Sequence, residues 1–178
     1  MRAIDAELLS GSELYREVVL GKLAHARESV FIATANVKDM HVEGRSITAL
    51  FSELAGRGVE LRILHATPPS RPFRATLARR PGLARALQLR TCPRVHFKTV
   101  IVDGAFVYVG SANWTGAGLG AKGTGRRNFE LGFAGADDGL LDRVQELFDR
   151  IWRGGACKGC RLREVCPAPL DGPRPHSK

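Results

Sequence analysis

At residues 95–113 the chain reads VHFKTVIVDGAFVYVGSAN. Two runs rich in β-branched and aromatic residues, 95–102 and 105–109, are separated by the dipeptide Asp103-Gly104. An Asp-Gly pair between two such runs is the strongest short-range signal of a β-hairpin. The stretch therefore predicts two adjacent antiparallel strands, from which the rest of the fold can be worked out.

The predicted hairpin brings four polar side chains to one end. His96 and Lys98 are two residues apart, so the pleat of a strand places both on one face, opposite Phe97. The second strand returns to Ser111 and Asn113 close to where the first began. This set suits phosphoryl transfer without a metal, because the imidazole can act as nucleophile or proton carrier while the others donate to phosphate oxygens.

Helices and strands alternate along the rest of the chain, which favours an α/β layered fold. A helix from Ser12 to about Ser29 precedes a buried strand at 30–35, and a helix over 46–56 precedes a strand at 59–64. The later elements are less regular. We expect a short helix at 73–79, a strand near 85–91, a mobile glycine-rich basic loop at 115–127, a strand at 128–133 and a last helix from Asp137 or Asp138 to Trp152.

The polar residues of the hairpin form the pattern H-x-K-x4-D-x6-G-S-x-N. This pattern resembles the signature of the phospholipase D superfamily, and a chance match has a probability on the order of one in a million. The resemblance implies an α/β fold, with a mixed β-sheet flanked by helices, as a catalytic domain over residues 1–153. The positions of the last three cysteines indicate a metal-binding tail over residues 154–178. The matched positions are His96, Lys98, Asp103, Gly110, Ser111 and Asn113.

Members of this superfamily use two such motifs, held by one chain or by two. Residues 1–90 contain no second H-x-K, so the resemblance implies a homodimer with the active site at the interface. His96 of one subunit would attack phosphorus and form a phosphohistidine, and His96 of the other would protonate the leaving oxygen.

The resemblance extends to Glu130, which falls where the superfamily carries an acidic residue. It implies that Glu130 accepts a hydrogen bond from the non-reacting ring nitrogen of His96. Asp103 has two interpretations: a direct catalytic role, or a turn residue that binds nearby backbone.

Positive charge dominates the composition. The 178 residues carry a formal charge of +9, which indicates an anionic partner such as nucleic acid, an anionic lipid surface or a small phosphorylated substrate. Residues 61–102 hold nine basic and no acidic residues, either as a solvated face or, as we favour, an anion-binding face. The nucleic-acid contacts that we expect are Arg94, Lys122, Arg126 and Arg127.

The four cysteines are Cys92, Cys157, Cys160 and Cys166, and the last three form a C-x2-C-x5-C-P run. The run is similar to the C-terminal cysteine run of iron–sulfur nucleases of CRISPR adaptation and bacterial recombination, and to the cluster loop of endonuclease III. That resemblance implies a structural [4Fe–4S] cluster, with Cys92 as the obvious fourth ligand. A structural zinc is the alternative, and unligated thiols are a third interpretation.

Short single-motif relatives include small bacterial nucleases that work without metals, a restriction endonuclease, the piRNA-pathway nuclease of animal mitochondria and proteins of phage defence. We therefore expect a metal-independent phosphodiesterase that hydrolyses DNA or RNA and needs no cofactor for catalysis. A phospholipid hydrolase or phosphatidyl transferase is the alternative, although no segment has a wide apolar face with basic flanks. A non-catalytic nucleic-acid-binding module is the third.

The remaining expectations concern location and single residues. No apolar stretch is long enough for a membrane span, and Asp5 and Glu7 interrupt any secretory signal, so we expect a cytoplasmic protein. Trp114 is either a core anchor or a base-stacking platform. We expect the other histidines to be surface or packing residues: His25, His41, His65 and His176.

Overall fold

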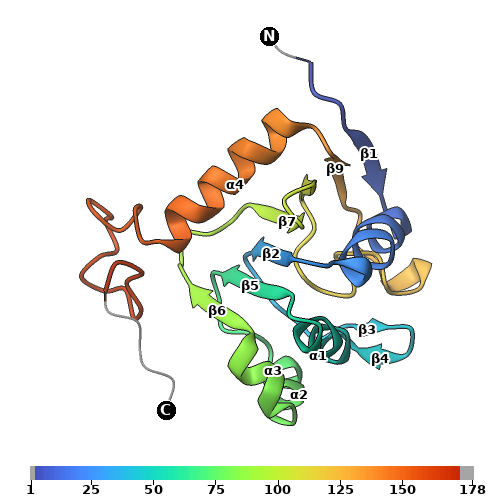
Figure 1. Cartoon of the computed structure of the whole chain (residues 1–178), viewed down its shortest axis with the longest axis horizontal. Helices are drawn as coiled ribbons and strands as arrows, with labels where there is room; N and C mark the ends of the chain where they lie inside the picture. The colour runs from blue at the N-terminus through green and yellow to red at the C-terminus, as the bar shows by residue number, and fades with distance from the viewer. Residues whose placement is uncertain (1–2, 173–178) are drawn as a thin grey trace.

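A seven-stranded mixed sheet forms the centre of the molecule, and the computed structural model describes it within residues 3–172 (Figure 1). The strand order is β1-β9-β8-β7-β2-β5-β6. Strands β2, β5 and β6 run parallel, whereas β7, β8, β9 and β1 add to the sheet in antiparallel pairs. The bounds are β1 Glu7–Ser10, β2 Ser29–Thr34, β5 Glu60–His65, β6 Gln88–Thr91, β7 Lys98–Val102, β8 Phe106–Gly110 and β9 Leu131–Gly135.

Helices cover both faces of this sheet, which confirms the predicted class. The larger hydrophobic core lies between one face of the sheet and the helices of the N-terminal half, which include α1 to α3. The smaller core lies under α4, which packs over β7 and β8 (Figure 1). A two-stranded ribbon, β3 (His41–Val42) with β4 (Arg45–Ser46), precedes α1. The helical bounds are π-helix η1 Leu14–Lys22, 3₁₀-helix η2 Leu23–His25, α1 Ile47–Gly56, α2 Arg71–Ala78, α3 Pro81–Ala86, 3₁₀-helix η3 Thr124–Arg126 and α4 Asp138–Trp152.

Local sequence explains where the two main helices begin and end. The Ser46 hydroxyl accepts a hydrogen bond from the Thr48 N–H at 3.2 Å and caps α1, which ends before Gly58 with its φ of 85°. The Asp137 carboxylate accepts from the Leu140 N–H at 2.8 Å and caps α4. Apolar residues of α4 then face the sheet, where Phe148 stacks on Phe31 with ring centroids 5.5 Å apart.

The β7–β8 hairpin forms as predicted, with Asp103 and Gly104 at φ values of 55° and 58°. These values belong to a type I′ turn, which the Ala105 N–H closes on the Val102 carbonyl at 3.0 Å. The first strand starts at Lys98 rather than at residue 95. The reason is a preceding turn at Pro93, in which the Val95 N–H binds the Cys92 carbonyl at 2.9 Å.

Several other expectations need correction. The first helical segment ends at His25, not Ser29, and the strand expected at 85–91 is α3 followed by the shorter β6, because Pro81 starts a helix. The strand expected at 128–133 lies at 131–135. Strands β1, β3 and β4 were not predicted, since runs of two to four residues carry too little periodicity.

The glycine-rich segment is more ordered than a mobile loop. Residues 115–120 are mostly buried, and Leu119 is 1% exposed. Gly120 has a φ of 77°, and a Cβ there would meet the Gly11 carbonyl oxygen at 2.0 Å, so the segment packs directly on the backbone before η1. The part that remains exposed is the basic half around Lys122 and Arg126.

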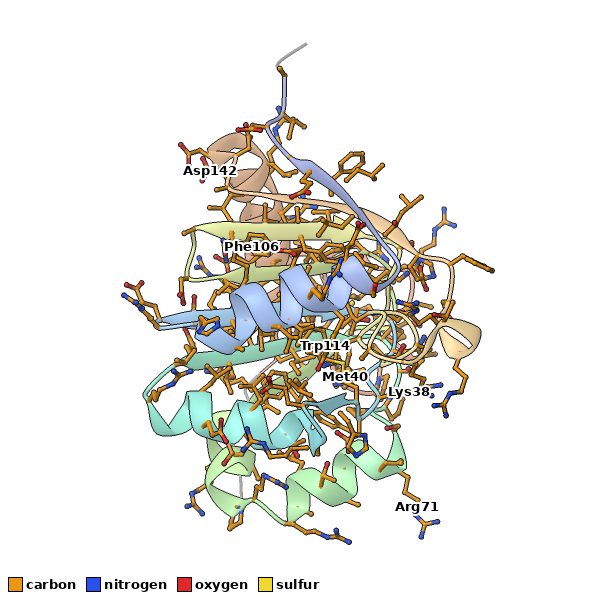
Figure 2. The ribbon with its side chains drawn as sticks, turned by 90° about the vertical axis from the view of Figure 1, so that its right-hand side faces the viewer. Lys38, Met40, Arg71, Phe106, Trp114 and Asp142 are labelled. Atoms are coloured by element: carbon orange, nitrogen blue, oxygen red, sulfur yellow. The ribbon has the colours of Figure 1, made fainter. Side chains whose placement is uncertain are left out.

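No helix within residues 3–172 is both long and apolar enough to cross a membrane. His176 and the last part of the expected tail at 154–178 lie outside the described residues. Figure 2 shows Trp114 among the helices and strands of the larger core, and its side chain is 2% exposed. Trp114 is therefore a core anchor rather than a base-stacking platform.

Candidate active site

The predicted polar residues gather at one edge of the sheet, where the parallel strands have their carboxyl ends. Because β7 is antiparallel to β2, its first residue, Lys98, lies at this edge, and Lys98 pairs with Gly110 at the end of β8. Ser111 follows Gly110 directly. Open α/β sheets commonly bind their ligands outside the carboxyl ends of the parallel strands.

Lys98 and His96 contact each other. The Lys98 Nζ lies 3.3 Å from His96 Nδ1 and donates to the His96 carbonyl oxygen at 2.5 Å. Lys98 is buried, with 8% exposure, whereas His96 is exposed to solvent. An ammonium only donates, so this contact leaves the proton of a neutral His96 on Nε2. A phosphate oxygen that binds Lys98 would free Nδ1 for another partner.

Asn113 is held by the segment after β2. Its Oδ1 accepts a hydrogen bond from the Asn36 N–H at 3.3 Å and lies 3.2 Å from the Thr34 hydroxyl oxygen. The Asn36 N–H requires an acceptor, which fixes the carboxamide with its oxygen toward Asn36. Its NH2 group makes no hydrogen bond within residues 3–172 and remains available to donate to a phosphate oxygen.

Ser111 and Glu130 form the other side of the site. The Ser111 hydroxyl donates to a Glu130 carboxylate oxygen and accepts from the Leu131 N–H at 3.2 Å. Asn128 donates its side-chain N–H to the other Glu130 oxygen at 3.1 Å. Within the described chain no hydrogen bond joins Glu130 to His96, so the direct His96–Glu130 contact that the resemblance implies is not formed here.

A glycine and a buried tyrosine shape the floor of the site. A Cβ on Gly110 would lie 2.2 Å from the Tyr108 hydroxyl oxygen and 2.7 Å from the Leu131 carbonyl oxygen, so only glycine fits. Gly132, which pairs with Gly110, leaves room for the same ring. Burial raises the pKa of Tyr108 to about 12, so the phenol is neutral at physiological pH.

Asp103 lies at the opposite end of β7 from His96, and its role in this structure is the turn role. Its carboxylate accepts backbone N–H groups of Arg27 at 2.9 and 3.1 Å, Glu28 at 2.8 Å and Ser29 at 2.9 Å. Partial burial acts to raise the pKa of Asp103, but these N–H donors outweigh it and hold the pKa below its ordinary value. Asp103 thereby joins the hairpin turn to the start of β2.

An open groove with a volume of about 340 Å³ lies between the start of η1 and residues 124–129, which precede Glu130 in the chain. Arg127 lines it, as predicted for a phosphate contact, together with Arg16 of η1, which sequence reasoning missed. Asn128 links the groove to the site through its bond to Glu130. Lys122 and Arg126 are exposed on the same loop, whereas Arg94 hydrogen-bonds Cys160 in the segment after α4.

The arginine-rich stretch is not a uniform anion-binding face. Arg62 pairs with Glu60 at 2.7 Å and Asp149 at 3.8 Å, and its guanidinium stacks on the rings of Phe31 and Trp152. Arg90 also lies over Trp152. Glu60 lies just before this stretch and Asp149 lies in α4. A count of charged residues within 61–102 therefore could not identify these acidic partners. Other arginines, such as Arg71, point outward from α2 (Figure 2).

All four cysteines line one cavity of about 210 Å³ between the end of β6 and the segment after α4. They are free thiols, and no group of three or more His, Cys, Asp or Glu side chains within residues 3–172 is arranged to hold a metal ion. Hydrogen bonds from the Leu162 N–H and from Arg94 lower the pKa of Cys160. The predicted metal centre at these cysteines remains a prediction.

Thr34 and Asn36 are site residues that sequence reasoning did not identify. The Thr34 hydroxyl accepts from the Trp114 N–H at 3.0 Å, so it positions both Asn113 and the chain that follows. The available signal was a Thr-x-Asn sequence at the end of a buried strand. Among the histidines, His65 is buried and binds the Thr67 carbonyl at 2.9 Å, and burial lowers its pKa, as expected of a packing residue.

Solved structures with the same fold include NucT from Helicobacter pylori and Nuc, a phospholipase D family member from Salmonella typhimurium. NucT is 17% identical with a TM-score of 0.61, Nuc is 21% identical with a TM-score of 0.59, and each comparison covers 83% of this chain and 95% of the other. Phosphatidylserine synthase from Haemophilus influenzae Rd KW20 is 16% identical with a TM-score of 0.60, over 82% of this chain and 38% of the synthase. No curated protein sequence matches the chain.

The family model described as "Cardiolipin synthase, PLD-like domain" matches residues 19–152. This range holds the sheet from β2 to β9, every residue of the site and the whole of α4. It ends at Trp152, before the segment with the last three cysteines. The chain therefore belongs to the phospholipase D-like family.

Proposed function

We propose that the protein is a metal-independent phosphodiesterase that hydrolyses nucleic acid through a phosphohistidine at His96. The observation that carries the proposal is the group of His96, Lys98, Ser111 and Asn113 at one edge of the sheet. This group offers a nucleophile and proton carrier beside three donors for the charge that develops on the phosphate oxygens. A buried lysine and a carboxamide with a free NH2 are suited to that charge.

The reaction would take two steps. The unprotonated ring nitrogen of one His96 attacks phosphorus and forms a P–N bond as the P–O bond to the leaving group breaks, and a second His96 gives its proton to the leaving oxygen. Water then attacks the phosphohistidine, loses a proton to the second His96 and releases the first. The two histidines start in different protonation states, so the rate should follow a bell-shaped pH profile.

The second histidine would come from a second copy of the chain. Supporting this, β1 and β9 expose an apolar strip beside the site, formed by Leu8, Leu131 and Phe133 at 58%, 56% and 51% exposure. Leu8 pairs with Phe133, and Leu131 directly follows Glu130. A second copy that buries this strip would place Ser111 and Glu130 at the interface.

Nucleic acid is favoured over lipid for two reasons. The groove lined by Arg16 and Arg127 also includes Asn128, which hydrogen-bonds Glu130, and basic side chains bind the phosphate backbone without regard to sequence. The chain also covers nearly the full length of Nuc and NucT but only 38% of phosphatidylserine synthase. Phospholipid hydrolysis or phosphatidyl transfer remains the second candidate, because the same catalytic group supports it.

The test is a substrate panel in EDTA at low salt: end-labelled single- and double-stranded DNA and RNA, and vesicles with labelled phosphatidylglycerol. Wild type is compared with His96→Ala and with His41→Ala, a matched control on the exposed ribbon β3. We expect nucleic-acid cleavage by wild type and His41→Ala but not by His96→Ala. Lipid turnover with intact nucleic acid would overturn the nuclease in favour of the lipid enzyme, and binding without any turnover would favour a binding module.

A further inference from the structure

We propose that Cys92, Cys157, Cys160 and Cys166 bind a thiolate-ligated metal centre that joins the C-terminal segment to the strand that carries His96. The chain has four cysteines, and the fold brings all of them to one cavity although Cys92 is 65 residues before Cys157. The chemistry is that of a soft metal, either an iron–sulfur cluster or zinc.

The first two ligands of the segment lie on a tight turn. The Cys160 N–H binds the Cys157 carbonyl at 3.1 Å, and Gly159 between them has a φ of 74°. A four-residue turn of this kind brings its first and last side chains close together, as a pair of ligands to one centre requires. A further turn follows, in which the Arg163 N–H binds the Cys160 carbonyl at 3.0 Å, and leads toward Cys166.

Cys92 faces this turn from the body of the protein. The Cys92 N–H donates a hydrogen bond of 2.8 Å to the carbonyl of His65, the last residue of β5. The Cys92 carbonyl accepts a hydrogen bond from the Val95 N–H. Cys92 is thus fixed to the sheet, whereas the other three cysteines lie on a segment of turns after α4. A centre with ligands from both would hold this segment in place (Figure 1).

The surroundings suit such a centre. Apolar side chains, including Val95, Phe97 and Ile151, line the cavity beside the partly buried cysteines, and an apolar shell of this kind limits the access of water to metal–thiolate bonds. Arg94 and Arg150 line its rim. Four thiolates around a divalent zinc, or around a [4Fe–4S] core of the same charge, carry a net charge of about −2, which these guanidinium groups balance.

The open volume favours the cluster over zinc. A tetrahedral zinc holds sulfur at about 2.3 Å, so its four ligands would touch one another and enclose no space. The four thiols line a cavity of about 210 Å³, and no group of three or more His, Cys, Asp or Glu side chains within residues 3–172 is close enough to hold a single ion. A polynuclear centre needs less movement of the segment.

The proposal is tested on the full chain purified without air, by metal and acid-labile sulfide analysis, absorbance near 400 nm and thiol reaction with a chromogenic disulfide. We expect about four iron and four sulfide per chain, or about one zinc after loading with Zn²⁺ alone, with all four thiols protected until a chelator is added. These readouts do not depend on activity, so they hold whether or not the protein is a nuclease.

Two variants assign the ligands. Cys92→Ser and Cys160→Ser should both lose the metal, whereas Ala156→Ser, which adds the same hydroxyl to the cavity wall, should keep it. Amide hydrogen exchange of residues 92–97 should rise on metal removal, since the centre holds Cys92. A chain that takes up neither Zn²⁺ nor iron with sulfide and has four reactive thiols, or a Cys92→Ser variant with full metal content, would overturn the proposal. The thiol protection of wild type decides the question even if a serine variant fails to fold.

Discussion

At the scale of single residues, Asn113 depends on the chain after β2 for its orientation. Thr34 and Asn36 hold its oxygen, and the free NH2 group is aimed to donate where negative charge develops. Because this donor acts on the transition state, Asn113→Ala should lower kcat by about 10²–10³ and change KM little. Asn128→Ala, which removes a bond to Glu130 but no donor from the site itself, should cost less than about tenfold. Steady-state kinetics of both variants check this, and an Asn113→Ala rate within threefold of wild type would refute the role.

Asp103 contributes to stability rather than to chemistry. Asp103→Asn keeps a residue that tolerates the positive φ of 55° but loses the charge that three backbone N–H groups stabilise, so it should cost about 1–2 kcal/mol. The folded pKa lies below the unfolded value of about 3.9, so the stabilisation is full above about pH 4 and is lost as the pH falls through the folded pKa. Urea unfolding from about pH 3 to 7 should show the difference between the two proteins narrowing at the acidic end. A difference that stays constant over this range would argue against a charged Asp103.

At the scale of elements, strands β8 and β9 pack closely because Gly110 and Gly132 have no side chains and so leave room for the Tyr108 ring. Gly110→Ala would drive a methyl group into the Tyr108 hydroxyl and should destabilise the protein by about 1–3 kcal/mol. Gly123→Ala, which has open space around its Cβ, should change stability by less than about 0.5 kcal/mol. Thermal unfolding measures both, and Tyr108→Phe should relieve part of the Gly110→Ala loss. Equal stability of the two alanine variants would show that the packing is not tight.

The groove between η1 and the glycine-rich loop should bind phosphates. In a His96→Ala background, Arg127→Ala should reduce the slope of log Kd against log salt for a single-stranded oligonucleotide by about 1. Arg57→Ala is the matched control, because Arg57 follows α1 at the opposite edge of the sheet and should leave the slope unchanged. Fluorescence anisotropy over a range of salt concentrations measures the slope, and the same slope for Arg127→Ala and the background protein would rule out this groove.

The sequence predicted those elements whose signals are local. The type I′ turn at Asp103-Gly104 and the caps Ser46 and Asp137 act through neighbouring residues, so the hairpin, α1 and α4 were correctly placed. Contacts between residues far apart in the sequence could not be predicted from such local signals. The hold of Thr34 on Asn113, the pairing of Arg62 with Asp149, and the docking of Gly120 on Gly11 each require the folded chain.

At the scale of the whole molecule, the apolar strip on β1 and β9 should be a dimer interface. Phe133→Glu places a charge in the strip and should convert a dimer to a monomer with at least a tenfold loss of activity, because the second His96 is removed. Val165→Glu is the control, because it adds the same charge at an apolar residue that is 77% exposed and lies away from the sheet. This variant should leave the dimer intact. Sedimentation velocity measures the state, and a fully active Phe133→Glu monomer would contradict the shared site.

The proposed mechanism requires His96 to form the covalent bond to phosphorus without a metal. The most direct measurement is rapid-quench mass spectrometry of wild type and His96→Ala with a single-stranded oligonucleotide in EDTA. We expect a nucleotide adduct on the peptide that contains His96, stable in alkali and lost in acid, and neither adduct nor cleavage with His96→Ala. Cleavage by His96→Ala at the wild-type rate, or an adduct on another residue, would contradict it.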